Sequence, residues 1–245
     1  METTMTLAER PLAERRFYSW YVIGLAALVL AGFSSSFYLP GIVVFPGPKP
    51  TLTPLLYVHG IVFTAWMLLF VAQTQLITAG RRKLHMSLGV SGFGLAIVML
   101  GLMFWISGAQ IARGSHPPFV TSLAWSALPY FVIPQFALFL GLGWKYRLQG
   151  QVHKRFMLLA ALMMMEPALG RLPLMPGGVL GTAISAALAW LTIVPLMVWD
   201  RRTLGKLHWV TLLGAGVIGG ALLLRFAVWQ TAGWAAIAKT LAGMV

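Results

Sequence analysis

Three of the five histidines occupy equivalent places in this sequence, each after a short basic stretch and at the start of a long apolar one. They are His85, His153 and His208. Imidazole titrates near neutral pH and is the commonest metal ligand in proteins. Together with Asp200, three imidazoles would suit Zn, Fe or Cu. Two of them could instead hold the iron of haem b from both sides, with loop arginines and lysines on its propionates.

Simpler roles for these histidines stay open. A histidine beside lysines and arginines at a membrane interface can contact lipid headgroups or a neighbouring loop. It can also bond the free backbone groups at a helix start. A third alternative is a role with a proton or a quinol.

A second polar set lies further along the apolar runs: His59, Glu166, Arg171 and Arg225. Ionisable groups are costly in hydrocarbon, so each is a functional candidate. Glu166 needs a counter-charge or a proton there, and we expect Arg225 to be its first partner. The pair would either pin two helices together or form a proton path or an outward-facing pocket. Arg171 and Arg225 would suit an anionic group or a quinone head.

Composition places these residues in a membrane protein. Of the 245 residues 59% are hydrophobic and 9% are charged, and the mean hydropathy is +0.82. A soluble domain has about 25% charged residues. The chain has no cysteine, which excludes disulfides, Fe–S clusters and thiolate metal sites. It also lacks the motifs of nucleotide loops, serine nucleophiles and zincins.

Apolar runs of about 20 residues predict helices that cross a bilayer. Seven are expected, at 17–39, 55–79, 86–109, 118–144, 153–175, 178–199 and 208–234. The predicted fold is all-α: a polytopic membrane protein with one transmembrane domain over 1–245. Residues 1–16 form a tail, and 40–54 form a stiff proline-rich outer loop.

The basic residues predict the orientation, because cytoplasmic loops are rich in Lys and Arg. With the N-terminus in the cytoplasm and the C-terminus in the periplasm, the inner side holds 13 of the 18 basic residues: Arg10, Arg15, Arg16, Arg81, Arg82, Lys83, Lys145, Arg147, Lys154, Arg155, Arg201, Arg202 and Lys206. The net charge of +13 is therefore a topology signal, and no nucleic acid partner is expected. Arg201, Arg202 and Lys206 are the expected partners of Asp200.

Several different short motifs are distributed from residue 55 to the end of the sequence. They comprise His59-Gly60, Trp66, Phe70, Gln73, Gly80-Arg81, Leu84-His85, Leu88-Gly89, His153-Lys154-Arg155, Arg171-Leu172-Pro173, Asp200 and Leu207-His208. The set resembles a widespread family of uncharacterised bacterial inner-membrane proteins. That resemblance implies the seven-span fold and no activity. A looser architectural analogy links the chain to cytochrome b-type proteins, which pair histidines on both sides of the membrane. Here at most one inner haem fits.

Two functions therefore remain for a multi-pass protein of the bacterial cytoplasmic membrane. In the first, a redox protein holds a haem or metal ion at His85, His153 and His208, and its outer pocket handles a proton or a quinone. In the second, the chain is a non-catalytic subunit, an assembly factor or a small transporter, and its polar residues are structural. The expected partners are membrane lipids, with a quinone or another membrane protein as alternatives.

Overall fold

The computed structural model describes residues 10–45 and 52–244, which form helices and no strands. Among these described residues, six helical segments are long and apolar enough to cross a membrane, so the chain is a multi-pass membrane protein. In chain order the elements are α1 (Arg10–Phe33), continued by the π-helix η1 (Ser34–Tyr38), α2 (Pro54–Thr78), α3 (Arg82–Ala112), α4 (Ser122–Trp125), α5 (Ala127–Lys145), α6 (Gly150–Leu162), α7 (Met165–Leu169), α8 (Gly178–Leu191), α9 (Val194–Leu204), α10 (Trp209–Val228) and α11 (Ala232–Ala242).

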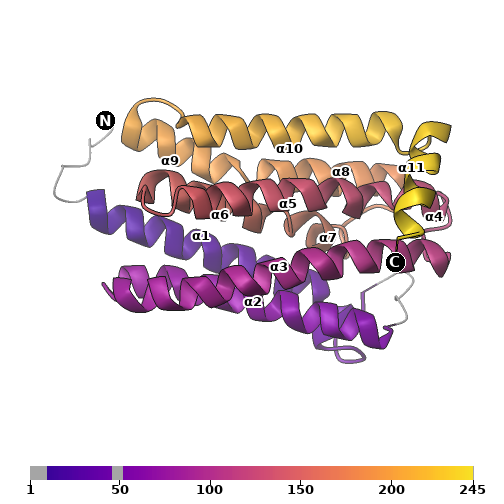
Figure 1. Ribbon diagram of the computed structural model, residues 1–245, viewed down its shortest axis with the longest axis horizontal. Coiled ribbons are helices and arrows are strands. Elements are labelled where there is room, and N and C mark those ends of the chain that lie inside the picture. Colours follow the sequence, from indigo (N-terminus) through magenta and orange to yellow (C-terminus); the bar gives the residue numbers. More distant parts are fainter. Residues whose placement is uncertain (1–9, 46–51, 245) are drawn as a thin grey trace.

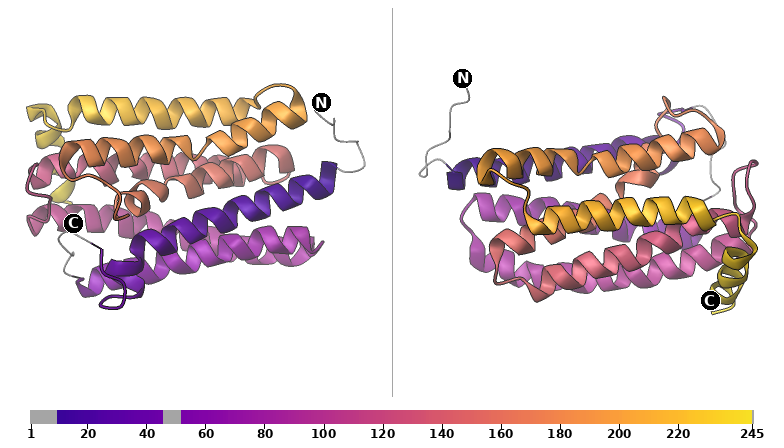
Figure 2. Two further views of the ribbon diagram at one scale, coloured as in Figure 1. Left: turned by 180° about the vertical axis from the view of Figure 1, so that it is seen from behind. Right: turned by 90° about the horizontal axis from the view of Figure 1, so that it is seen from above.

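The long helices lie side by side along the length of the molecule (Figure 1). Helix α3 packs against α2 and α5, while α10 packs against α5, α6 and α8. Seen from above, α8 and α9 follow one another beside α10, and α11 folds across the far end (Figure 2). The expected last span, 208–234, is thus divided between α10 and α11.

The segment expected as the fifth span, 153–175, is not one helix. Helix α6 ends at Leu162 and the five-residue α7 follows after a tight turn. In that turn, Met163 and Met164 donate their N–H groups to carbonyls three residues back. Pro167 explains the break, because its ring lacks an N–H for the carbonyl of Met163 and collides with it.

This broken segment lies in the interior of the bundle. Phe156 and the whole stretch from Leu158 to Met165 are buried, so the three consecutive methionines belong to the core and do not face lipid. Helix α6 packs against α5, α10 and α1, while α7 packs against α1 and α8. The long helices therefore enclose most of α6 and α7.

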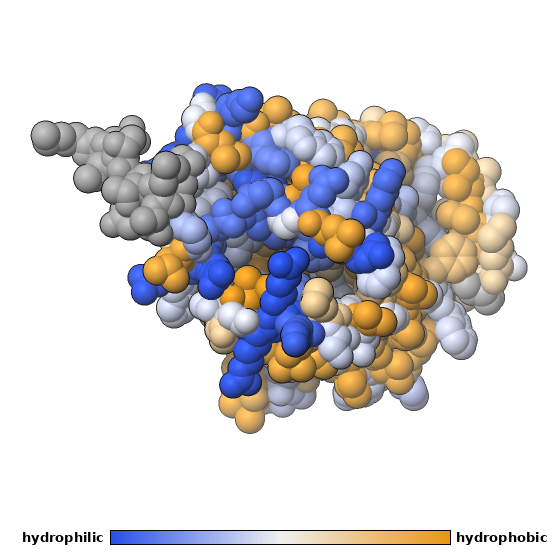
Figure 3. Space-filling model, turned by 60° about the vertical axis from the view of Figure 1, so that its left-hand side comes forward, coloured by the Kyte–Doolittle hydropathy of each residue, from blue (hydrophilic) through white to orange (hydrophobic). Residues whose placement is uncertain are grey.

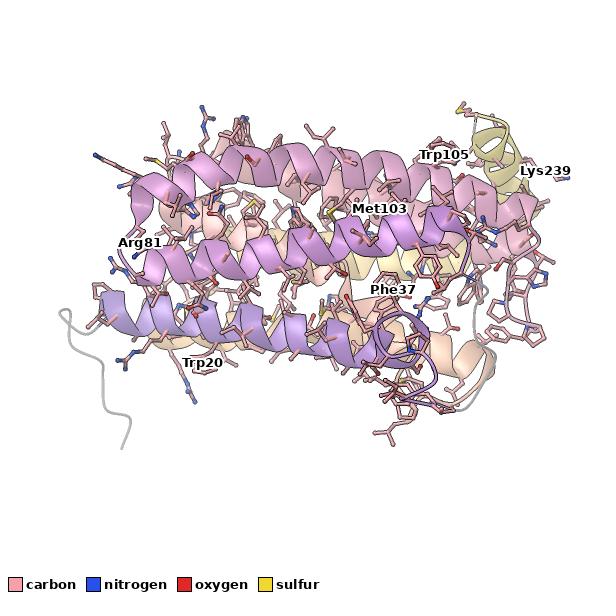
Figure 4. The ribbon with its side chains drawn as sticks, turned by 90° about the horizontal axis from the view of Figure 1, so that it is seen from below. Trp20, Phe37, Arg81, Met103, Trp105 and Lys239 are labelled. Carbon is pink, nitrogen blue, oxygen red and sulfur yellow. The ribbon has the colours of Figure 1, made fainter. Side chains whose placement is uncertain are left out.

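The basic stretches all lie at one end of the bundle, which we call the basic end. The start of α1 and the turns α2–α3, α5–α6 and α9–α10 meet there (Figure 1), and hydrophilic side chains gather on that face (Figure 3). Arg81 lies at this end and Lys239 at the other, while Trp20 and Trp105 point outward nearer opposite ends (Figure 4). The grouping expected from the sequence is confirmed as a feature of the fold.

The proline-rich loop is described only in part. Ile42 and Val44 are exposed, with 80% and 67% of their surface accessible, so they do not fold back over the helices. Residues 46–51 of this expected loop lie outside the described residues, as do 1–9 of the expected tail.

The close approach of α1 to α7 depends on Gly32. A Cβ at this position would collide with the backbone of Ala168 in α7, whereas a Cβ at Gly24 on the same helix meets nothing. Small residues let membrane helices pack closely. At Gly32 the obstacle is backbone, which cannot rotate away as a side chain would.

Substituting Gly32→Ala should lower the free energy of unfolding by about 1–3 kcal/mol, as overpacking does. Gly24→Ala, the matched control, should leave it unchanged or slightly raised, because alanine favours helix. Thermal and detergent unfolding of the purified protein measures both. Equal stability of the two variants would contradict the contact between α1 and α7.

Candidate functional site

The three helix-leading histidines all lie at the basic end, but they do not form one group. His85 in α3 and His153 in α6 are neighbours, with ring centres 6.3 Å apart and ring planes at 82°. His208 precedes α10, which lies across the bundle from α3 with α5 between them (Figure 1). Within residues 10–45 and 52–244, no three or more His, Cys, Asp or Glu side chains are grouped to hold a metal ion. The expected site of three imidazoles with Asp200 is therefore not assembled.

Neighbouring helices hold both rings of the close pair. His153 Nδ1 lies 2.8 Å from the carbonyl oxygen of Gly143 in α5 and donates its proton there. The side-chain amide of Gln73, from α2, contacts His85 Nδ1. When the amide nitrogen faces His85, it donates to Nδ1, and the amide oxygen accepts the N–H of Gly89. Ring orientation set through Nδ1 leaves Nε2 of each histidine for a further contact.

His208 has a structural role at the start of α10. Its Nδ1 accepts a hydrogen bond from Val210 N at 3.2 Å, capping the helix. Its backbone N–H donates to Asp200 Oδ2 at 3.0 Å. Burial lowers the pKa of His208, and the charge of Arg155 lowers it further, which favours the neutral ring that can accept this bond. Of the expected roles, bonding at a helix start is the one seen here.

Asp200 pairs with a residue that the sequence did not single out. Arg155, from α6, donates through Nε at 3.1 Å and Nη2 at 2.5 Å to Asp200 Oδ1. Thr211 donates to Oδ2 at 2.5 Å. The side chains of Arg155 and Asp200 are 1% and 0% exposed. The expectation that Arg201, Arg202 or Lys206 pairs with Asp200 was wrong, because the carboxylate faces inward while its neighbours face outward.

The sequence did carry a signal for Arg155. Val152, Arg155, Phe156 and Leu159 recur at helical spacing and are all buried, so Arg155 lies on the inner face of α6. Its place in the basic run after α5 made it resemble a loop charge. Its neighbour Lys154 forms an ion pair with Glu14 of α1, whereas Arg155 points to α9. Gln151 joins the two pairs, because it accepts a hydrogen bond from Arg155 and donates one to Glu14.

In the other half of the bundle, Glu166 pairs with Arg225 as expected. Two parallel hydrogen bonds, at 2.7 and 2.8 Å, join the guanidinium of α10 to the carboxylate of α7. Such two-pronged contacts are the strongest kind of ion pair in proteins. Arg225 follows the first residue of α10 by 16 positions, roughly 24 Å from the basic end.

A cavity of about 40 Å³ adjoins this pair. Gln135 of α5, Trp190 of α8, Glu166 and Arg225 line it, with apolar side chains around them. Two buried polar atoms of the lining, Arg225 Nε and Gln135 Oε1, have no protein partner. Since one water needs roughly 10–15 Å³ by this measure, the cavity of about 40 Å³ has room for about three or four waters or a comparably small polar group.

The rest of the outer set lies apart from Glu166. Arg171 donates from Nη1 to the carbonyl of Pro167 at 2.7 Å and lies over the ring of Phe33. His59 stacks against Phe63, and its buried Nδ1 has no partner. The four residues therefore form two separate groups. One is the Glu166–Arg225 pair, and the other consists of His59 and Arg171 near the end of α1.

The buried network at the basic end predicts a large loss on breaking its ion pair. Asp200→Asn should lower the free energy of unfolding by about 3–5 kcal/mol, because Arg155 keeps a buried charge without a counter-charge. Adding Arg155→Gln should recover part of this loss. Arg201→Gln, the exposed control, should change little. Thermal unfolding measures all three, and an unaffected Asp200→Asn protein would contradict the pair.

No protein-family model, no curated protein and no solved structure matches this chain significantly. No relative therefore assigns a role to these residues. Their interpretation follows from their own geometry, burial and charge.

Proposed function

We propose that this chain is a seven-span protein of the bacterial cytoplasmic membrane that moves protons through its interior at Glu166 and Arg225. The carrying observation is the broken helix α6–α7, whose Glu166 pairs with Arg225 beside a cavity that has two unpartnered polar atoms in its lining. Intramembrane carboxylates of this kind mark proton and substrate pathways. Interrupted helices inside a bundle serve such sites because their irregular backbone lines a cavity.

The topology proposed with this function counts α6, α7 and residues 170–177 as one passage. This passage joins α5, which ends at the basic end, to α8, which begins at the other (Figure 1). The basic end then faces the cytoplasm, with the N-terminus inside and the C-terminus in the periplasm. The Glu166–Arg225 pair would lie in the outer half of a hydrocarbon core of about 30 Å.

The chemistry follows from the pairing. While Glu166 is ionised, its charge is balanced by Arg225 through two hydrogen bonds. A proton that binds to Glu166 neutralises the carboxylate and weakens its attraction to Arg225. The guanidinium can then bond to groups in the cavity. Arg225 Nε and Gln135 Oε1, both without a protein partner, provide a donor and an acceptor for water there. Proton gain and loss at Glu166 would thus be coupled to hydration of the cavity.

Proton flux into liposomes that contain the purified protein tests this proposal, with a pH-sensitive dye inside and a potassium diffusion potential as driving force. Glu166→Gln should reduce the proton flux to that of protein-free vesicles, because an amide does not bind and release protons as a carboxylate does. This variant also leaves Arg225 uncompensated and should lose about 3–5 kcal/mol of stability.

The double variant Glu166→Gln with Arg225→Gln separates function from folding. It removes both charges, so it should regain most of the stability but no flux. A double variant that conducts protons as well as the unmodified protein would overturn the proposal and leave the pair as a structural pin. His116→Ala, in the exposed α3–α4 loop, serves as the control with unchanged flux.

A redox role is the second candidate, favoured by the pair His85 and His153. A metal–imidazole bond is about 2.0–2.1 Å, so two imidazoles on opposite sides of one ion have ring centres roughly 6 Å apart. The observed separation is 6.3 Å. His153 Nδ1 donates to α5, as ligating histidines do, while His85 Nδ1 accepts from the Gln73 amide of α2 when its nitrogen faces the ring. The pair would hold a transition-metal ion or haem b, with Arg81, Arg82 and Lys83 nearby for propionates.

Visible absorption and metal analysis of the purified protein, before and after incubation with haemin, Cu or Zn, test this second candidate. One equivalent should bind, and His85→Ala or His153→Ala should each abolish binding. His208→Ala should keep it, because that ring caps α10. Protein that binds neither haem nor metal, or that loses binding only with His208→Ala, would reject the redox role.

A further inference from the structure

Two adjacent arginines at the end of α9 line an open groove at the basic end. Arg201 and Arg202 form its polar side, while Met197, Val198 and Leu207 form its apolar side. Both arginines are exposed, and Val198 is 42% exposed. The groove therefore has a basic rim on an apolar wall, on the surface of a membrane protein and at the level where its helix ends.

The arginines have no acidic partner in the described part of the chain. Its three acidic side chains are already used: Glu14 pairs with Lys154, Glu166 with Arg225 and Asp200 with Arg155. Asp200 precedes Arg201 directly, yet it faces inward to Arg155 and Thr211. Within residues 10–45 and 52–244, no acidic side chain therefore balances the positive charge of the groove.

The turn that carries the groove is well fixed. Gly205 ends α9 in the left-handed conformation, at φ 71°, and its N–H closes on the carbonyl of Arg201. Beyond it, the Asp200 carboxylate accepts the N–H of His208. The two guanidinium groups and the apolar wall are thus held at the joint of α9 and α10 and do not depend on a mobile loop.

We propose that this groove binds one anionic phospholipid. The headgroup phosphate would bond to Arg201 and Arg202, since guanidinium groups match phosphate oxygens in two-pronged contacts. The first segment of an acyl chain would lie on Met197, Val198 and Leu207. Basic pockets between membrane helices on the cytoplasmic side bind acidic headgroups in this way. The apolar wall favours a lipid over a free anion, because a free anion gains nothing from it.

Native mass spectrometry of the protein in mild detergent, titrated with phosphatidylglycerol or phosphatidylcholine, tests the site. The unmodified protein should retain one phosphatidylglycerol more tightly than phosphatidylcholine. Arg201→Gln with Arg202→Gln should weaken this retention by roughly 30-fold, at about the strength expected for two basic residues at a membrane surface.

The matched control is Arg81→Gln with Arg82→Gln, which removes an equal charge from an exposed arginine pair at the same end. It should leave the tight phosphatidylglycerol unchanged. Equal losses in both double variants would show diffuse attraction to the basic end and overturn the groove. Unchanged retention in the Arg201 and Arg202 variant would overturn it as well.

Val198→Asn tests the apolar wall. It should weaken phosphatidylglycerol while leaving the weak binding of inorganic phosphate unchanged. If inorganic phosphate displaces the lipid at equal concentration, the groove is a free-anion site and the lipid proposal is wrong. Helical circular dichroism and thermal unfolding of each variant establish that it is folded, and these exposed positions should leave both unchanged.

Discussion

Two buried ion pairs connect the interior segment α6–α7 to the surrounding helices, because a charge buried in this bundle requires a counter-charge. Helices α6 and α7 contribute Arg155 and Glu166, and each finds its counter-charge on another helix, Asp200 in α9 and Arg225 in α10. A buried charge without a partner is strongly destabilising, so these contacts fix where α6 and α7 lie against α9 and α10. The two pairs occupy different depths and therefore fix the rotation of the segment as well as its position.

The two pairs nevertheless differ in what surrounds them. Thr211 and the backbone N–H of His208 donate to Asp200 Oδ2, so both carboxylate oxygens have hydrogen-bond partners. The Arg225 guanidinium keeps an unpaired Nε beside a cavity. A closed network stabilises one arrangement, whereas a buried donor next to water-sized space can exchange partners. This difference separates the Arg155–Asp200 pair from the pair that we propose takes part in proton movement.

Much of the architecture followed from sequence pattern alone. The apolar runs identified the six long helical segments, and the basic stretches identified which turns share one end. The pairing of Glu166 with Arg225 was also predictable, because a lone carboxylate at that depth has few candidate partners. The fifth run gave no sign that its helix is interrupted, because hydropathy counts apolar residues and does not register that Pro167 breaks the helix at Met163. A buried interior segment and a lipid-facing span have the same composition.

The sequence by itself determined the class of the protein, its helical segments and the end at which its basic residues gather, because these depend on local composition and on the thickness of a bilayer. Only the tertiary structure decided that His85 neighbours His153 and not His208, that Asp200 turns to Arg155, and that Arg201 and Arg202 have no acidic partner among the described residues. These facts depend on the order and rotation of helices in the bundle. Both arise from packing between residues far apart in the chain, which no local pattern records.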